Sequence, residues 1–282
     1  MEVKLISWTN EPIKTAARAC AICYDSEPSP RLVKQCIASM HLSTIEHINF
    51  TFEVSGASRS LTHQLVRHRI ASYSQQSQRY VDMKDAQFVY PPYTNGYQKD
   101  EYKQAFDNAA ESYMALQNLG VKNEDARAVL PNACPTKIIF TMNLRSLGHF
   151  MNERLCSRAQ QEIRKMALAM IEELKRNKDT MGLDDEEMEI ILSLCVPKCE
   201  SGKIKFCPEY KSCRRQKTAK EINAIVSKSE ERAEWIYKWE NIYCSSCGGK
   251  FSPSLSNAKF CPNCGVKINE EGKINVCAGT DM

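Results

Sequence analysis

The spacing of apolar residues predicts an α+β domain over residues 1–193. Residues 48–54 alternate between apolar and polar side chains with a period of two, which is typical of a half-buried strand. Residues 136–142, rich in Ile, Phe and Thr, and residues 3–6 also favour strands. Helical spacing and helix-start signals predict helices at 12–20, 29–40, 61–69, 102–119, 144–152 and 159–177. We find no internal repeat in this domain.

The pattern changes after residue 193. Residues 194–240 combine scattered cysteines with a charged segment, 219–240, that we expect to be a helical linker. Residues 241–282 form a cysteine-rich module. Two Cys-x-x-Cys-Gly motifs, with Cys244, Cys247, Cys261 and Cys264, lie thirteen residues apart. Four thiolates at this spacing are typical of a structural zinc ribbon, and the alternative is a pair of redox dithiols.

Cysteine and histidine usage sharpens this picture. None of the five histidines lies beyond His149, so any metal site in the tail must be all cysteine. Fourteen cysteines without a secretion signal favour a reducing, cytoplasmic location, and no segment approaches the roughly 20 apolar residues of a membrane helix. A second metal site is one interpretation of Cys195, Cys199, Cys207 and Cys213, and Cys277 has no assignment. Whether the tail binds nucleic acid or protein, or only stabilises itself, stays open.

A cationic stretch at residues 67–80 is the most informative segment. Arg67, His68 and Arg69 are expected at the C-terminal end of a helix, with Gln64 on the face of Arg67 and His68 and with Arg69 about 200° away from Arg67. One element would then face two ligands. A solvated basic patch, favoured by the helix dipole, is the plainer alternative for an isolated Arg-His-Arg triplet. The net charge of +4 does not indicate a nucleic-acid surface.

The longer pattern favours a binding site over that alternative. Arg-His-Arg, seven residues, then Ser77 and Arg79 resembles the signature of the flavin-dependent thymidylate synthases. Residues 143–163 resemble the family's second block, Arg127 precedes it at the family's distance, and residues 41–47 resemble its first block. The resemblance covers about residues 1–193. Many members have Asn, Glu and His where this chain has Ser74, Gln75 and Arg158.

The resemblance implies helices around an antiparallel sheet, and a homotetramer with sites between subunits. It implies reductive methylation of dUMP to dTMP, with methylenetetrahydrofolate as carbon donor, FAD as hydride carrier and NADPH as reductant. The FAD residues carried over are His41, Ser43, Glu46, Arg67, His68, Arg69, Ser74, Asn143, Arg145, His149 and Arg158. The dUMP residues are Gln64, Arg67, Gln75, Ser77, Arg79, Arg127 and Arg154.

Catalytic roles are expected for Arg154, Arg79 and Ser77. The two arginines would stabilise charge developing on the uracil carbonyls, and Ser77 would bind rather than attack. Cys134 and Cys156 lie in apolar or helical contexts typical of packing, so no cysteine nucleophile is expected. Two rival hypotheses remain. One is a non-enzymatic scaffold whose arginines contact nucleic-acid phosphates, and the other is a flavoprotein with a different reductase activity.

Overall fold

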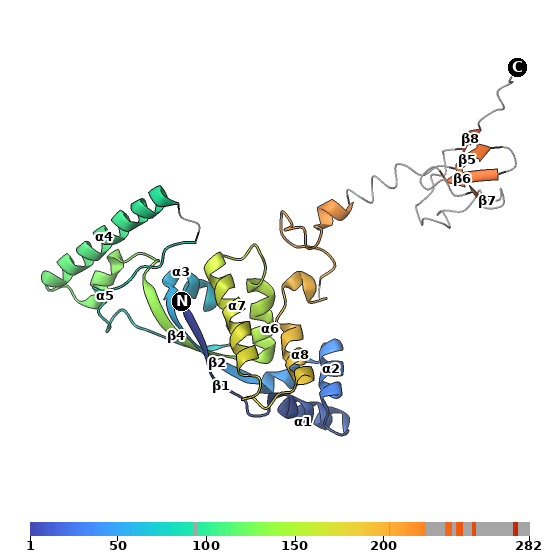
Figure 1. The fold of residues 1–282 in the computed structure, drawn as a ribbon, viewed down its shortest axis with the longest axis horizontal. Coiled ribbons are helices and arrows are strands. Elements are labelled where there is room, and N and C mark those ends of the chain that lie inside the picture. The colour runs from blue at the N-terminus through green and yellow to red at the C-terminus, as the bar shows by residue number, and fades with distance from the viewer. Residues whose placement is uncertain are drawn as a thin grey trace, which may run out of the picture. The chain divides into compact units, whose positions relative to one another are not determined.

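The computed structural model describes residues 1–92, 95–202, 204–223, 235–238, 241–244, 250–251 and 273–275. The chain divides into two compact units, Met1–Ile204 and Lys205–Met282. Figure 1 labels the elements of both units. No helix of the described part is long and apolar enough to cross a membrane.

The first unit is built on a four-stranded antiparallel sheet in the order β1-β2-β4-β3. Its strands are β1 (Glu2–Trp8), β2 (Asn49–Ser58), β3 (Ser72–Gln75) and β4 (Pro135–Asn143). The predicted strands at 3–6, 48–54 and 136–142 are confirmed, whereas β3 was not predicted. The helices are α1 (Pro12–Tyr24), α2 (Pro30–Ala38), α3 (Arg59–Leu65), α4 (Gly96–Asn118), α5 (Asn123–Ala126), α6 (Leu144–Arg154), α7 (Gln161–Arg176) and α8 (Asp185–Leu194). Short 3-10 helices are η1 (Leu42–His47), η2 (Arg127–Val129) and η3 (Lys198–Glu200).

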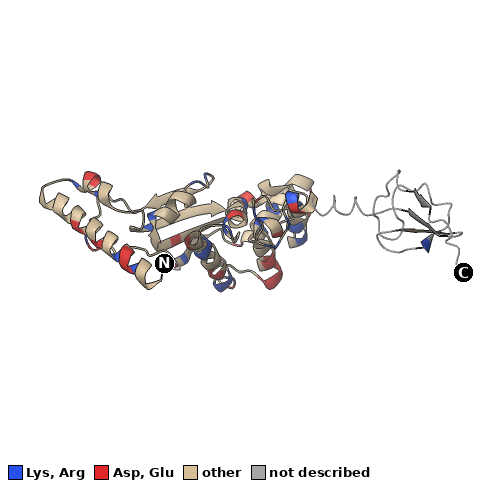
Figure 2. Cartoon of the chain, turned by 90° about the horizontal axis from the view of Figure 1, so that it is seen from above, with Lys and Arg blue, Asp and Glu red and all other residues tan. Residues whose placement is uncertain are grey.

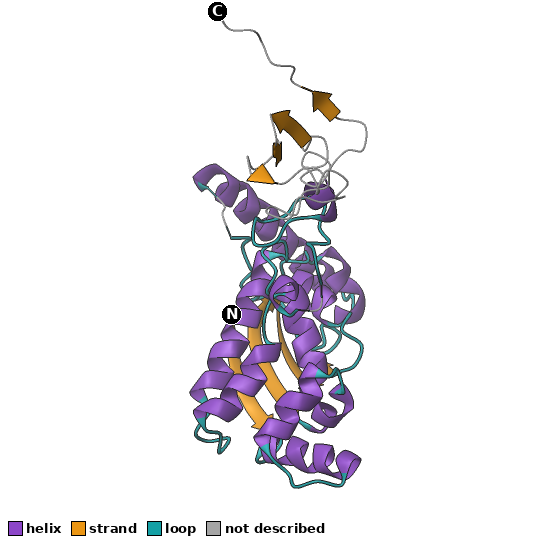
Figure 3. Cartoon of the chain, turned by 90° about the vertical axis from the view of Figure 1, so that its right-hand side faces the viewer, coloured by secondary structure: helices purple, strands orange, loops and turns teal. Residues whose placement is uncertain are grey.

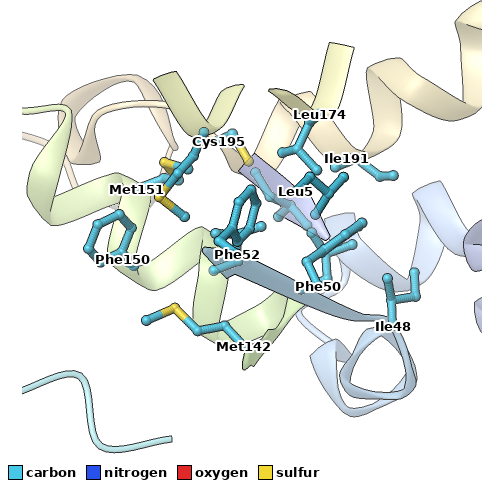
Figure 4. Packing of buried hydrophobic residues seen from close by; sticks show 14 of the residues in the cluster. Leu5, Ile48, Phe50, Phe52, Met142, Phe150, Met151, Leu174, Ile191 and Cys195 are labelled. Atoms are coloured by element: carbon cyan, nitrogen blue, oxygen red, sulfur yellow. The ribbon is translucent and has the colours of Figure 1, made fainter. Parts of the chain in front are cut away.

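One face of the sheet forms the main core. Phe50, Phe52 and Val54 of β2 alternate with polar residues, and Phe52 stacks on Phe140 of β4 with ring centroids 5.7 Å apart. Helices α6 and α7 cover this face (Figure 1), and Figure 3 shows helices lying against the strands. Figure 4 shows Phe50, Phe52 and Phe150 among the apolar side chains of this core. Burial of these aromatic and aliphatic side chains supplies most of the driving force for the fold.

A second, smaller core holds the long helix α4 to the sheet. It contains Met83, Tyr113, Ala126 and Cys134, with Leu116 and other partly buried side chains around them. In Figure 1, α5 lies beside α4, away from α6. This arrangement separates two of the regions that the sequence assigns to ligand binding.

The second unit contains another four-stranded sheet. Its strands are β5 (Trp235–Lys238), β6 (Asn241–Cys244), β7 (Lys250–Phe251) and β8 (Lys273–Asn275), in the order β7-β6-β5-β8. The helical linker expected over 219–240 is therefore wrong in its last part, because residues 235–238 pair with β6 as a strand. Trp, Ile and Tyr favour that conformation.

Candidate active site

Helix α6 organises the candidate site, because it carries Arg145, His149 and Arg154. Its start is fixed by Asn143, whose side-chain oxygen accepts a hydrogen bond from the backbone N–H of Ser146 at 2.8 Å. This N-cap satisfies a helix donor that would otherwise lack a partner. Asn143, predicted from the sequence to bind the flavin, thus also serves as the N-cap of α6.

The turn after α3 presents the Arg-His-Arg motif. The prediction that this motif lies on the helix is wrong, because α3 ends at Leu65. The hydroxyl of Tyr73 lies 2.9 Å from the carbonyl oxygen of Leu65 and 2.7 Å from that of His68, which holds the turn closed against β3. Arg67 and Arg69 are exposed in this turn, whereas His68 is half-buried.

His68 and Arg154 meet in the centre of the site. The Nε of Arg154 donates to Nε2 of His68 at 3.1 Å, and Nη2 of Arg154 donates to the carbonyl oxygen of Gln64 at 3.3 Å. The His68 ring also contacts the rings of His149 and Phe150 edge-on, with centroids 5.6 Å and 5.0 Å away. Side chains from α6 and from the turn after α3 therefore converge on one imidazole.

The contact defines the protonation state of His68. An arginine side chain has only donors, so Nε2 of His68 must be the acceptor and the ring proton sits on Nδ1. Burial, reinforced by the charge of Arg154 and by His149, lowers the pKa of His68 to about 4. Burial also lowers the pKa of Arg154, which nevertheless stays charged near neutral pH. A neutral imidazole beside a permanent cation is the result.

Two residues outside the predicted set support this arrangement. Gln160 caps α7 by accepting from the N–H of Ile163, and it accepts a second hydrogen bond from Nε2 of Gln64, both at 3.3 Å. The carboxylate of Glu162 accepts from the N–H and the hydroxyl of Ser58 at 2.7 Å and 2.6 Å. The start of α7 thus fixes the start and the end of α3. Gln is not among the residues that usually mark a helix start, so the sequence carried no clear signal for the cap role of Gln160.

Arg79 and Arg127 belong to a second, more exposed cluster. Nε and Nη2 of Arg79 donate to Oε2 of Glu124 at 3.1 Å and 3.0 Å, and Nε of Arg127 donates to the carbonyl oxygen of Glu124 at 3.0 Å. The hydroxyl of Ser77 accepts from the N–H of Arg79 at 3.2 Å. Glu124 lies on α5, so this cluster occupies a different part of the molecule from Arg154.

The remaining β3 residues split between the sheet interior and its surface. Nε2 of Gln75 donates to the hydroxyls of Thr62 and Thr136 at 3.0 Å and 3.2 Å, and both threonines are buried. Ser74 is exposed. Gln75 therefore ties α3 and β4 together, and its amide nitrogen is already engaged.

A third group of predicted residues lies at η1. The side chain of Arg145 donates to Oε1 of Glu46 at 2.6 Å, which joins the start of α6 to η1. His41 and Ser43 are exposed beside it, and the His41 ring contacts Tyr24. Arg158, also exposed, follows α6. On a single chain the predicted flavin residues therefore form two patches, one in the turn after α3 and one at η1. Helix α6 contributes residues to both.

Comparison with known proteins decides the family. A family model described as thymidylate synthase complementing protein matches residues 4–177. The flavin-dependent thymidylate synthase of Clostridium tetani is 41% identical over 209 residues, which cover 62% of this chain and 83% of the relative. That of Pyrococcus furiosus is 38% identical over 231 residues, which cover 74% and 90%. The chain belongs to the flavin-dependent thymidylate synthase family.

A solved member of the family shares the fold. The crystal structure of the flavin-dependent thymidylate synthase from Helicobacter pylori, complexed with FAD and dUMP, is 25% identical to this chain. The match has a TM-score of 0.50 and covers 64% of this chain and 97% of that one. Because the family model ends at residue 177, the cysteine-rich tail lies beyond the segment that it matches.

The sequence predicted two groups of metal-binding cysteines in the tail, a zinc-ribbon group and a second cluster. Cys247, Cys261 and Cys264 lie outside the described residues, and Cys244 is described only as the last residue of β6. Across the described ranges, no group of three or more His, Cys, Asp or Glu side chains could hold a metal ion. Cys195 lies in the core of the first unit, where burial raises the pKa of its thiol to about 12. The structure therefore gives no support to a second metal site at Cys195, Cys199, Cys207 and Cys213.

Proposed function

We propose that this protein is a thymidylate synthase that methylates dUMP to dTMP. Methylenetetrahydrofolate supplies the carbon, and FAD, reduced by NADPH, carries the hydride that completes the methyl group. The observation that carries the proposal is the contact between His68 and Arg154. It joins a residue assigned to the flavin to a residue assigned to the nucleotide, in a chain whose family is flavin-dependent.

The donor set suits the flavin cofactor. Arg67 and Arg69 leave exposed guanidinium groups in the turn after α3, and His68 keeps its Nδ1 proton as a neutral donor. Arg145 adds a cation at the other end of α6, where only an exposed ion pair with Glu46 holds it. A dinucleotide has a diphosphate that needs cationic donors and a ring system that needs neutral ones. We therefore assign the flavin to the surface along α6.

The nucleotide residues have complementary tasks. Arg154, half-buried and held by two hydrogen bonds, is preorganised to stabilise negative charge on a uracil carbonyl. Arg79, Arg127 and Ser77 supply the guanidinium and hydroxyl donors that a phosphate prefers. The hydroxyl of Ser77 accepts from a backbone N–H, and its own proton remains available to an anionic ligand.

The environment of Cys134, one of the cysteines near the predicted site, supports a route in which this residue is not a nucleophile. Cys134 is fully buried, and burial raises the pKa of its thiol. Its sulfur also accepts a hydrogen bond from Nε2 of Gln78 at 3.2 Å. A thiol that is buried and protonated is a poor nucleophile. The chain's contribution to activating C5 of uracil is therefore placement and charge.

Two features support assembly into a homotetramer with shared sites. The cluster of Arg79 and Arg127 lies on a different part of the chain from Arg154, so one nucleotide meets both sets most simply where two subunits join. Apolar side chains beside these residues are also exposed, including Ile70 at 74% and Tyr80 at 79%. Exposed apolar surface of this kind is typical of subunit interfaces.

We further infer a structural zinc ion in the tail, bound by Cys244, Cys247, Cys261 and Cys264. Strands β6 and β7 pair antiparallel, with Tyr243 opposite Lys250. The first Cys-x-x-Cys-Gly motif begins at the last residue of β6, and its spacing to the second motif is typical of four-cysteine zinc sites. Metal analysis of the purified full chain should find about one zinc per chain from four thiolates, and Cys261→Ser should release it.

The function is tested by the visible spectrum and by turnover. The purified protein should show flavin absorption, and it should release tritium from dUMP labelled at C5 only when NADPH and methylenetetrahydrofolate are present. Colourless protein whose nucleic-acid affinity falls steeply with salt would instead favour the scaffold hypothesis. Along α4, acidic and basic residues are interspersed (Figure 2), so this long helix does not present the basic face that the scaffold hypothesis would favour. Flavin absorption without tritium release would favour a different reductase.

A further inference from the structure

Helices α1 and α2 end in the same unusual way. Asp25 follows α1 with φ 46°, and Met40 lies just after α2 with φ 62°, so both occupy the left-handed region that non-glycine residues rarely adopt. In each case the next N–H reaches back to a carbonyl five residues earlier: Ser26 to Ala21 at 3.2 Å and His41 to Cys36 at 2.8 Å. These are Schellman-type helix ends.

The two helix ends bring Tyr24 and His41 together. Tyr24 is the last residue of α1, and His41 directly precedes η1. The hydroxyl of Tyr24 forms a hydrogen bond with Nδ1 of His41, and the two rings stack with centroids 6.1 Å apart and an interplanar angle of 13°. The hydrogen bond engages Nδ1 of His41, and the stacking on Tyr24 fixes the plane of the His41 ring.

This pair is not part of the apolar core. Tyr24 is 48% exposed and His41 is exposed, so the hydrogen bond between them is not required to satisfy buried groups. The pKa of Tyr24 is raised, chiefly by desolvation, so the phenol keeps its proton at neutral pH and has it available for donation. A phenol that donates to Nδ1 leaves the proton of a neutral imidazole on Nε2.

We propose that Tyr24 is a positioning residue for His41. Its hydroxyl holds His41 in the Nε2–H tautomer and in one orientation, so that Nε2 offers a fixed donor to the flavin cofactor. This inference rests on the proposed function, which assigns His41 to the flavin. Neither the Arg-His-Arg signature nor the other family-like blocks of the sequence contain Tyr24.

The test compares Tyr24→Phe, His41→Gln and the double variant in the full chain. Tyr24→Phe keeps the ring and removes only the hydroxyl. It should weaken FAD binding about threefold to tenfold, as expected for one lost orienting hydrogen bond. In the His41→Gln background the same change should have no further effect, because Tyr24 acts only through His41. Tyr97→Phe, at a tyrosine that is 87% exposed, is the matched control and should bind FAD as the wild type does.

Nitrogen NMR of histidine-labelled protein gives a readout that a purely structural role would not move. Wild-type His41 should show the Nε2–H tautomer, and Tyr24→Phe should show a mixture of tautomers. Equal FAD affinities in the wild type and Tyr24→Phe would overturn this inference but not the proposed function. The same would follow if Tyr24→Phe weakened FAD binding as much in the His41→Gln background as in the wild type. A wild-type protein that binds no FAD would overturn the proposed function and this inference with it.

Discussion

Two arginines assigned to the same nucleotide sit in opposite environments. Arg154 is half-buried, and its partners are a neutral imidazole and a backbone carbonyl. Arg79 is exposed, and its partner is the carboxylate of Glu124, with 52% and 37% of the two side chains exposed. An exposed ion pair contributes little to stability, typically about 0–1 kcal/mol. Arg154 is therefore fixed before a ligand arrives, whereas Arg79 can exchange one anion for another.

This difference separates catalysis from binding. A donor that is already in place stabilises charge in the transition state without reorganising, whereas a donor that changes partner contributes mainly to affinity. We therefore propose that the chemical step takes place in the region around His68 and that the region around Glu124 captures the phosphate. Each region is tested by a change that should not affect the other.

The largest effect is expected from Arg154→Ala. Turnover should fall by about 10²–10³ or more, because a preorganised donor to the developing charge is lost. Flavin absorption should persist, since Arg67 and Arg69 remain. Steady-state rates and the visible spectrum of the same sample measure both. Arg31→Ala, at an exposed arginine of α2, is the control, and near-normal turnover in Arg154→Ala would refute the assigned role.

Acid should weaken the fold through His68. Its pKa of about 4 in the folded protein lies below the ordinary value of 6.5, so the neutral form is favoured by folding. The contribution of neutral His68 to the free energy of unfolding is fully present above pH 6.5 and is lost as the pH falls towards 4. After allowance for solvent screening it amounts to about 1–2 kcal/mol. Urea unfolding at several pH values should show a loss in the wild type that is smaller in His68→Gln, and parallel curves would contradict the buried neutral imidazole.

A smaller effect is expected from Tyr73→Phe. This change removes the hydroxyl that binds the carbonyl oxygens of Leu65 and His68, and should cost about 1 kcal/mol of unfolding free energy. Turnover should fall together with stability, because the turn that carries His68 loosens. Thermal unfolding and initial rates measure the two effects. Tyr102→Phe, on α4 outside this turn, serves as the control. Unchanged stability in Tyr73→Phe would show that the turn closes without the hydroxyl.

The smallest effect is expected from Glu124→Gln. Removing the carboxylate frees Arg79 for the nucleotide, so the KM for dUMP should fall about twofold to fivefold, with kcat unchanged. Titration with dUMP and steady-state kinetics measure the change. Glu111→Gln, on α4, provides a matched carboxylate-to-amide control. A tenfold weaker affinity in Glu124→Gln would indicate instead that Glu124 contributes to binding.

The sequence predicted the helices and strands whose residues strongly favour a single secondary structure. Alternation over residues 48–54 predicted β2, and helical spacing over residues 144–152 predicted α6. The end of α3 was missed because Tyr73, a residue eight positions beyond Leu65, closes the turn. Strand β3 was missed for a similar reason, since Ser and Gln gain their strand conformation from pairing with β4.

The candidate site was predicted as a set of residues but not as an arrangement. The sequence spacing related Arg145 to His149, because residues four positions apart lie on the same face of a helix. They did not relate Arg154 to His68, or Arg79 to Glu124, since those contacts join segments 86 and 45 residues apart. Tertiary packing alone creates such pairs, and the neutral state of His68 follows from that packing.

Subunit complementation is the most direct test of the central claim that Arg79 of one subunit and Arg154 of another serve the same nucleotide. Arg79→Ala, which should bind dUMP weakly, and Arg154→Ala, which should turn it over slowly, are each nearly inactive at low dUMP concentration. They are coexpressed with different affinity tags, and the mixed oligomers are isolated and assayed at that concentration. If the sites lie between subunits, about a quarter of them in a random mixture contain both arginines, so about a quarter of wild-type turnover should return. Mixed oligomers that remain as inactive as their parents would show that both arginines act within one chain.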